Sequence, residues 1–164
     1  MRKPVFLTTI AAACAFAAPA AAQDKAPDAA QVVEAIAACQ AITTADWINL
    51  KQLRDHDFHA VAARGSGRSK RKVRGLYQKR GNEAFIIASR EELSAKQCVV
   101  SAALDSTADY VPLAQQVSGT IGMPVRQDGP AYFWEIEGQT IKIEPEGDAD
   151  EPFARFTVTA GTGE

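Results

Sequence analysis

The C-terminal third of the chain alternates apolar and polar residues over short segments separated by turn residues. Segments 132–136 and 140–144 flank Glu137-Gly138-Gln139, and residues 153–159 alternate in the same way. Alternation with a period of two is typical of β-strands that bury one face. Because glycine tolerates the positive φ of tight turns, neighbouring strands are expected to pair as antiparallel hairpins.

The first half of the chain carries the same pattern. A short strand is expected at 58–62, and segments 73–79 and 83–89 form a hairpin around Arg80-Gly81-Asn82. Residues 96–104 predict a further strand. Short turns between successive strands favour an antiparallel sheet over a parallel one.

Two stretches repeat apolar residues at helical spacing. Asp28, with Gln31 three residues later, is a variant of the capping box and predicts the start of the first helix. Its apolar face comprises Val32, Val33, Ile36, Cys39 and Ile42.

A later helix is predicted over residues 110–121, where Leu113, Val117 and Ile121 recur every four positions and Gly122 ends the pattern. A second short helix near the N-terminus is weaker. Thr43 or Thr44 would cap it, and it would carry Trp47, Leu50 and Leu53, but Ile48 and Leu50 also fit a strand.

These elements predict an α+β fold in a single domain, residues 28–164. One N-terminal helix, or two if the short second helix forms, precedes an antiparallel sheet of about six strands in two β triplets. The helix at 110–121 lies between the triplets, and the helices are expected to cover one face of the sheet. A helix before each triplet hints at a duplicated unit, although the two halves share no residue-level similarity.

The first 22 residues have the layout of a secretory signal. Sixteen of them are apolar, Arg2 and Lys3 are the only charges, and Ala20-Ala21-Ala22 precedes Gln23 as an A-x-A cleavage site. The apolar run is too short for a membrane-spanning helix. We therefore expect an exported chain, periplasmic or secreted, with residues 23–27 as a short polar tether.

A lipoprotein signal is the alternative for the same leader, because Cys14 follows three small residues, Ala11-Ala12-Ala13. Two features disfavour lipid attachment at Cys14. Residue Ala11 is smaller than the aliphatic residue usual at that position, and the segment after the cysteine stays apolar instead of becoming a polar tether.

Removal of the leader leaves two cysteines, Cys39 and Cys98, and an even pair in an oxidising compartment predicts a disulfide. Closing a loop of 59 positions would stabilise the fold by about 4 kcal/mol through the entropy of the unfolded chain. Two buried free thiols are the alternative. A redox-active pair is disfavoured because the C-x-x-C spacing is absent.

Charge is strongly polarised along a chain whose net charge is only −2. Residues 51–90 contain 11 basic and 3 acidic side chains, a net of +8, whereas residues 128–164 contain 2 basic and 9 acidic, a net of −7. Residues 64–80 hold eight basic side chains and no acid. The candidate binding residues in this stretch are Arg64, Arg68, Lys70, Arg71, Lys72 and Arg74.

Such a basic loop attracts phosphate and carboxylate groups. In an exported chain the expected partner is an anionic envelope component or an acidic protein surface. Nucleic acid is disfavoured by the leader, and Tyr77 is the one aromatic residue near the loop for base stacking. The alternatives are a loop that pairs with the acidic C-terminal region and a solvated loop without a partner.

No motif identifies a catalytic residue or a cofactor. The Gly65-Ser66-Gly67 run lacks the spacing of a P-loop and of a G-x-S-x-G elbow. His56 and His59, flanked by Asp55 and Asp57, are weak candidates for metal ligands and would share a face only on a helix. The expected function is non-catalytic binding; the alternatives are an envelope hydrolase or metal-binding protein using these histidines, or an inhibitor of a secreted enzyme.

Residues Tyr132-Phe133-Trp134 are expected to divide between the two faces of a strand. Alternation buries either Phe133 or the Tyr132/Trp134 pair and leaves the other side partly exposed.

Overall fold

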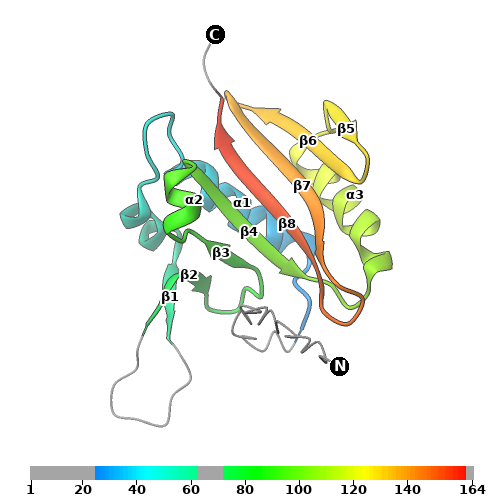
Figure 1. The fold of residues 1–164 in the computed structure, drawn as a ribbon, viewed down its shortest axis with the longest axis horizontal. Coiled ribbons are helices and arrows are strands. Elements are labelled where there is room, and N and C mark those ends of the chain that lie inside the picture. The colour runs from blue at the N-terminus through cyan, green and yellow to red at the C-terminus, as the bar shows by residue number, and fades with distance from the viewer. Residues whose placement is uncertain (1–24, 63–71, 162–164) are drawn as a thin grey trace, which may run out of the picture.

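The computed structural model describes residues 25–62 and 72–161 (Figure 1), which form one eight-stranded antiparallel sheet with three α-helices. The strands are β1 (Phe58–Ala62), β2 (Lys72–Lys79), β3 (Phe85–Ile87), β4 (Gln97–Ala103), β5 (Arg126–Asp128), β6 (Ala131–Ile136), β7 (Gln139–Gly147) and β8 (Pro152–Ala160). The helices are α1 (Ala29–Ile42), α2 (Arg90–Ser94) and α3 (Tyr110–Ile121), with short 3₁₀ helices η1 (Leu50–His56) and η2 (Thr107–Asp109). The predicted α+β class is confirmed.

The strand order, β1-β2-β3-β4-β8-β7-β6-β5, is mirrored about the centre of the sheet. A helix followed by a four-strand meander occurs twice, as α1 with β1 to β4 and as α3 with β5 to β8. The last strand of each meander is the inner one, and β4 pairs with β8 along seven residue pairs. The expected two triplets are therefore two groups of four.

The sequence pattern missed β5 because its residues, Arg126-Gln127-Asp128, are all polar and exposed. Pairing with β6 is what makes this segment a strand. An edge strand with both faces exposed has no alternation to detect.

The core lies between one face of the sheet and helices α1 and α3. Across the central strands, one row of paired residues runs Trp134, Ile141, Val158 and Cys98, and all four are at most 1% exposed. Burying each large apolar side chain in such a row stabilises the fold by about 1.5–3 kcal/mol. The row ends at Cys98, which the predicted disulfide joins to Cys39 on α1.

Helix α1 begins at its predicted cap, and helix α3 spans the predicted residues 110–121. Asp28 accepts a hydrogen bond from the Gln31 backbone, and the Gln31 side chain accepts one from the Asp28 backbone, which completes the capping box of α1. Gly122, with φ of 103°, ends α3.

The N-terminal region differs from the expected second helix. The segment is a 3₁₀ helix that begins at Leu50, so Trp47 lies outside it. Leu53 is fully buried, but Trp47 is 64% exposed on the loop before η1. The β-bridge between Thr43 and Ile48 explains the difference, because it closes residues 44–47 into a loop before η1 begins.

Helix α2 was not predicted and lies on the opposite face of the sheet from α1 (Figure 1). Its Glu92 forms an ion pair of 3.6 Å with Arg155, whose neighbours Ala154 and Phe156 point into the core. The expectation that the helices cover a single face is therefore wrong for α2. The predicted leader, residues 1–22, lies outside the described residues, and no helix in the described ranges is long and apolar enough to cross a bilayer.

Candidate functional site

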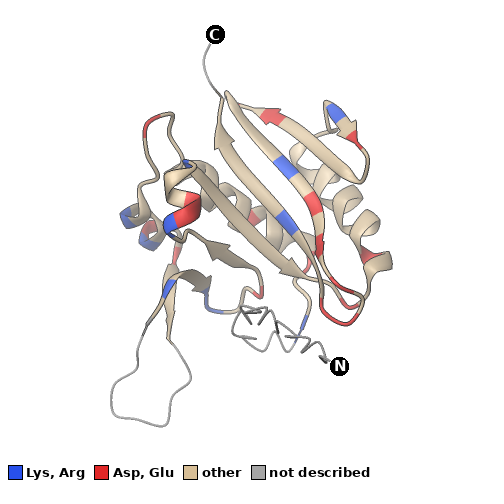
Figure 2. Ribbon diagram, in the orientation of Figure 1, with Lys and Arg blue, Asp and Glu red and all other residues tan. Residues whose placement is uncertain are grey.

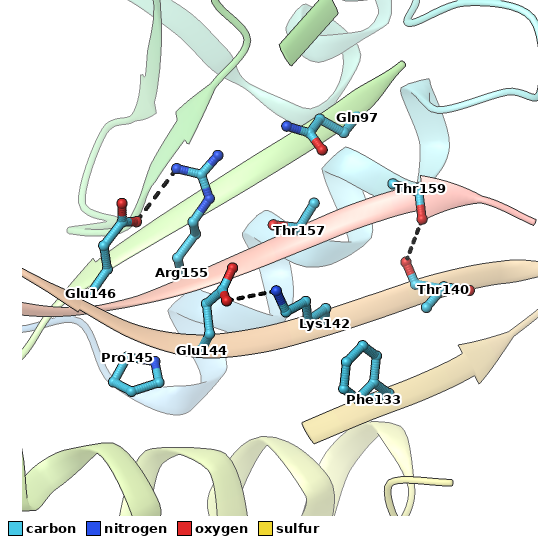
Figure 3. Close-up of a pocket in the computed structure, with 10 residues that line it drawn as sticks. All are labelled: Gln97, Phe133, Thr140, Lys142, Glu144, Pro145, Glu146, Arg155, Thr157 and Thr159. Atoms are coloured by element: carbon cyan, nitrogen blue, oxygen red, sulfur yellow. Dashed lines mark hydrogen bonds and ion pairs between the residues drawn. The ribbon is translucent and has the colours of Figure 1, made fainter. Parts of the chain in front are cut away.

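The face of the sheet opposite α1 and α3, here called the open face, contains a depression with a volume of about 580 Å³, called the first depression (Figure 3). Strands β7 and β8 supply most of its floor. Its lining residues are Gln97, Phe133, Thr140, Lys142, Glu144, Pro145, Glu146, Arg155, Thr157 and Thr159.

The charges of this first depression neutralise one another. Lys142 Nζ lies 2.6 Å from Glu144 Oε2, and the Arg155 guanidinium lies 3.4 Å from Glu146 and 3.6 Å from Glu92. Burial raises the pKa of Glu92, but hydrogen bonds from Ser89 and the charge of Arg155 outweigh it and lower the pKa overall. With each cation already beside a carboxylate, this surface has little net attraction for an ion.

Phe133 also faces this surface, with the Arg126 guanidinium 3.7 Å from its ring centroid. Of the two arrangements expected for the aromatic run, Trp134 is the buried residue, at 1% exposure, and Phe133 lies on the open face.

The second depression, with a volume of about 570 Å³, lies between η1, β2 and α2 and is here called the arginine depression. Its lining is largely apolar, but two arginines, Arg74 from β2 and Arg90 from α2, belong to it. The other lining residues are Leu50, Ala60, Val73, Gly75, Tyr77, Ala88, Ser89, Leu93 and Ser94.

A close backbone contact brings these two arginines to one depression. Gly75 adopts φ of +76°, its carbonyl accepts a 2.7 Å hydrogen bond from the Ala88 backbone, and a Cβ on it would lie 2.7 Å from Ser89 Cα. Ser89 caps α2 through a capping box with Glu92, so α2 starts at Arg90 directly beside this contact. The contact between Gly75 and Ser89 therefore places Arg74 on the strand and Arg90 on the helix beside the same depression.

Neither guanidinium is neutralised within the part of the chain that the structure describes. Arg74 and Arg90 are both exposed, and no described carboxylate lies within ion-pair distance of either. Lys79, on the same strand as Arg74, is different, since it lies 2.8 Å from Glu34 and 3.5 Å from Asp57. The two arginines thus keep their positive charge and their five N–H donors each for an external anion.

The remaining predicted binding residues lie along the chain before Arg74. Arg64, Arg68, Lys70 and Arg71 fall outside the described residues. Lys72 is the first residue of β2, where its backbone pairs with Ala62 of β1.

The weak metal candidates are separated by secondary structure. His56 ends η1, whereas His59 is exposed on β1, with Phe58 buried between them. Among residues 25–62 and 72–161, no group of three or more His, Cys, Asp or Glu side chains has an arrangement that could hold a metal ion.

Sequence reasoning missed Arg90 and the apolar lining of the arginine depression. A signal for α2 was present, because Ser89 is followed three residues later by Glu92, the spacing of a capping box. The contact between Gly75 and Ser89, 14 positions apart, had no local signal.

Comparisons with known proteins add nothing to this geometry. No family model, curated protein or solved structure matches the chain.

Proposed function

We propose that the chain is an exported, non-catalytic binding domain that holds an anionic partner at the arginine depression. The observation that carries the proposal is the position of two exposed arginines, Arg74 and Arg90, beside one largely apolar depression, without a carboxylate partner among the described residues.

The chemistry of the guanidinium group supports an oxyanion as the bound group. Its planar N–H donors match phosphate and carboxylate oxygens in bidentate geometry. The charges of the first depression are already paired, so an anion gains more at Arg74 and Arg90 than at Lys142 or Arg155.

The basic stretch predicted from the sequence, residues 64–74, adds to this attraction. It runs directly into β2, where Lys72 is two positions before Arg74. Like charges gathered near a site raise the local concentration of an oppositely charged partner and the rate of association. The partner class is therefore an anionic envelope component or an acidic protein surface, and the Cys39–Cys98 disulfide is consistent with an oxidising compartment.

Charge reversal at the arginine depression tests the proposal. Binding of inorganic polyphosphate and of polyglutamate is measured by calorimetry at low and at raised salt. Arg74→Glu and Arg90→Glu are each expected to weaken binding roughly tenfold, as the loss of a charge-assisted hydrogen bond predicts. Arg90 is the first residue of α2, where an acidic side chain is favourable, so the variant should still fold.

Arg80→Glu is the matched control, because it makes the same change in net charge in the exposed β2–β3 turn. It lies six residues from Arg74, roughly 20 Å along a strand, beyond the screening length of about 8 Å at physiological salt. Equal weakening by Arg80→Glu and Arg74→Glu would show that net charge, and not this site, governs binding.

The basic stretch is tested separately by replacing Arg68, Lys70, Arg71 and Lys72 together with glutamate. Salt-sensitive binding should be lost while the melting temperature stays nearly unchanged. A large loss of stability would instead indicate that the stretch pairs with the acidic C-terminal region.

A further inference from the structure

We infer that the anionic partner is the surface of a lipid bilayer and that Trp47 is the side chain that enters its interface; this inference rests on the function proposed above. Trp47 is 64% exposed, although tryptophan has a large apolar surface whose contact with water is unfavourable.

The loop that carries Trp47 is well ordered by its own hydrogen bonds. The backbone N–H of Thr44 donates to the Trp47 carbonyl over 3.0 Å, and the Thr44 hydroxyl bonds to the carbonyl and to the N–H of Trp47 over 2.8 and 3.1 Å. Residues Thr43 and Ile48 form a β-bridge across the base of the loop. The exposure of Trp47 is therefore a feature of the folded loop.

This loop adjoins the arginine depression on two sides. Leu50, three residues after Trp47, lines the depression. Lys96, two residues after the lining residue Ser94, donates a hydrogen bond of 3.2 Å to the carbonyl of Ala45. The exposed side chain of Trp47 and the largely apolar arginine depression therefore lie at the same end of the molecule.

Charge is distributed so that this end would face a negative surface. Figure 2 shows charges of both signs on η1 and α2, with a basic residue at the start of α2, whereas β7 and its connection to β8 are mainly acidic. The cations on the Trp47 loop, η1 and α2, taken together with Arg74 and Lys96, are Lys51, Arg54, Arg74, Arg90 and Lys96, and the acids on the same elements are Asp46, Asp55, Glu91 and Glu92, of which Glu92 is paired with Arg155. Strand β7 and its connection to β8, across the sheet from η1, carry Glu144, Glu146, Asp148, Asp150 and Glu151, and of these Glu144 and Glu146 are paired with Lys142 and Arg155.

This combination fits a bilayer better than a soluble polyanion. Tryptophan is amphipathic and prefers the boundary between headgroups and hydrocarbon, while lysine and arginine side chains interact with lipid phosphates around it. A soluble polyphosphate or polyglutamate offers nothing apolar for Trp47, Leu50 and Leu93 to contact.

Tryptophan fluorescence tests the inference directly, because the chain contains two tryptophans with opposite exposures. Trp134 is 1% exposed, and its indole N–H donates to the Gly122 carbonyl, so a change on binding reports Trp47. The protein is the chain from Gln23, the predicted mature N-terminus, which retains every described element. Its emission should shift to shorter wavelength with vesicles of phosphatidylglycerol and phosphatidylcholine in equal parts, and not with phosphatidylcholine alone.

Variants separate the inference from the proposed function. Trp47→Ala should reduce partitioning into the anionic vesicles at least fivefold and leave polyphosphate binding unchanged, whereas Arg74→Glu/Arg90→Glu should reduce both. Met123→Ala is the matched control, because Met123 is an 81% exposed apolar residue on the connection between α3 and β5. It should leave partitioning unchanged.

Polyphosphate binding without a shift in Trp47 emission would overturn the inference and leave the proposed function standing, with an acidic protein surface or soluble polymer as the partner. Equal losses in Trp47→Ala and Met123→Ala would also overturn it, since partitioning would then follow apolar area anywhere on the surface. Failure to bind both vesicles and polyphosphate would overturn the proposed function itself.

Discussion

Asn82 in the β2–β3 turn donates a hydrogen bond of 2.9 Å to the Glu34 carboxylate on α1. The same amide group donates to the Gln31 carbonyl over 2.9 Å, and its oxygen accepts from the Ala84 backbone over 2.8 Å. Asn82 is 2% exposed, and Lys79 completes the cluster with a 2.8 Å ion pair to Glu34. This cluster joins the β2–β3 hairpin to helix α1.

Asn82→Ala should lower the free energy of unfolding by about 2–4 kcal/mol, because it removes three hydrogen bonds and leaves the buried Ala84 N–H without its acceptor. Urea unfolding measures the loss. Arg80→Ala, an exposed change in the same turn, should stay within about 0.5 kcal/mol of the parent. A similar small change for both variants would mean that the Asn82 contacts contribute nothing net.

Stability should fall in acid through Glu34. Hydrogen bonds from Lys79 and Asn82 hold the pKa of the Glu34 carboxyl below its usual value of 4.5. A lowered folded-state pKa contributes stability above the unfolded value, and that contribution is lost as the pH falls through the folded one. Glu34→Gln should therefore flatten the pH dependence of unfolding below about pH 5.

Glu135→Gln is the control for this acid titration, because Glu135 is exposed on β6 and forms no ion pair with a described residue. Unfolding midpoints in urea across pH 2 to 7 compare the two variants. If the urea midpoint of Glu34→Gln changed with pH just as that of the parent protein does, the contribution of Glu34 to acid sensitivity would be contradicted.

Gly75→Ala and Gly81→Ala distinguish backbone conformation from close packing. Both glycines have similar positive φ, +76° and +80°, but a Cβ on Gly75 would meet the Ser89 backbone at 2.7 Å, whereas a Cβ on Gly81 meets nothing within 4 Å. Gly81→Ala should cost about 1 kcal/mol from its left-handed conformation alone. Gly75→Ala should cost about 2–4 kcal/mol because steric overlap is added. Thermal unfolding of both variants measures the difference, and equal costs would show that the strand yields freely.

Loss of the Cys39–Cys98 disulfide should lower the free energy of unfolding by about 4 kcal/mol, since the bond closes a loop of 59 positions in the unfolded chain. Reductant should shift the urea midpoint of the parent protein toward that of Cys39→Ala/Cys98→Ala and leave the double variant unaffected. An effect of reductant on the double variant would point to a cause other than this bond.

Local pattern was sufficient where a segment buries one face. The capping box at Asp28, the end of α3 at Gly122 and the alternation that buries Phe156 and Val158 are all properties of a few consecutive residues. Pattern was insufficient where both faces are exposed, as at Arg126-Gln127-Asp128, because pairing with β6 decides that strand.

For the candidate site, the sequence alone determined that positive charge gathers before and within β2, with Arg74 among the residues, and that Cys39 and Cys98 would pair. Tertiary structure decided the rest. Lys79 is neutralised by Glu34, 45 positions away, whereas Arg74 and Arg90 line one depression beside the close approach of Gly75 and Ser89. Charge is a property of each side chain, but its neutralisation depends on which distant side chains folding brings within a few ångströms.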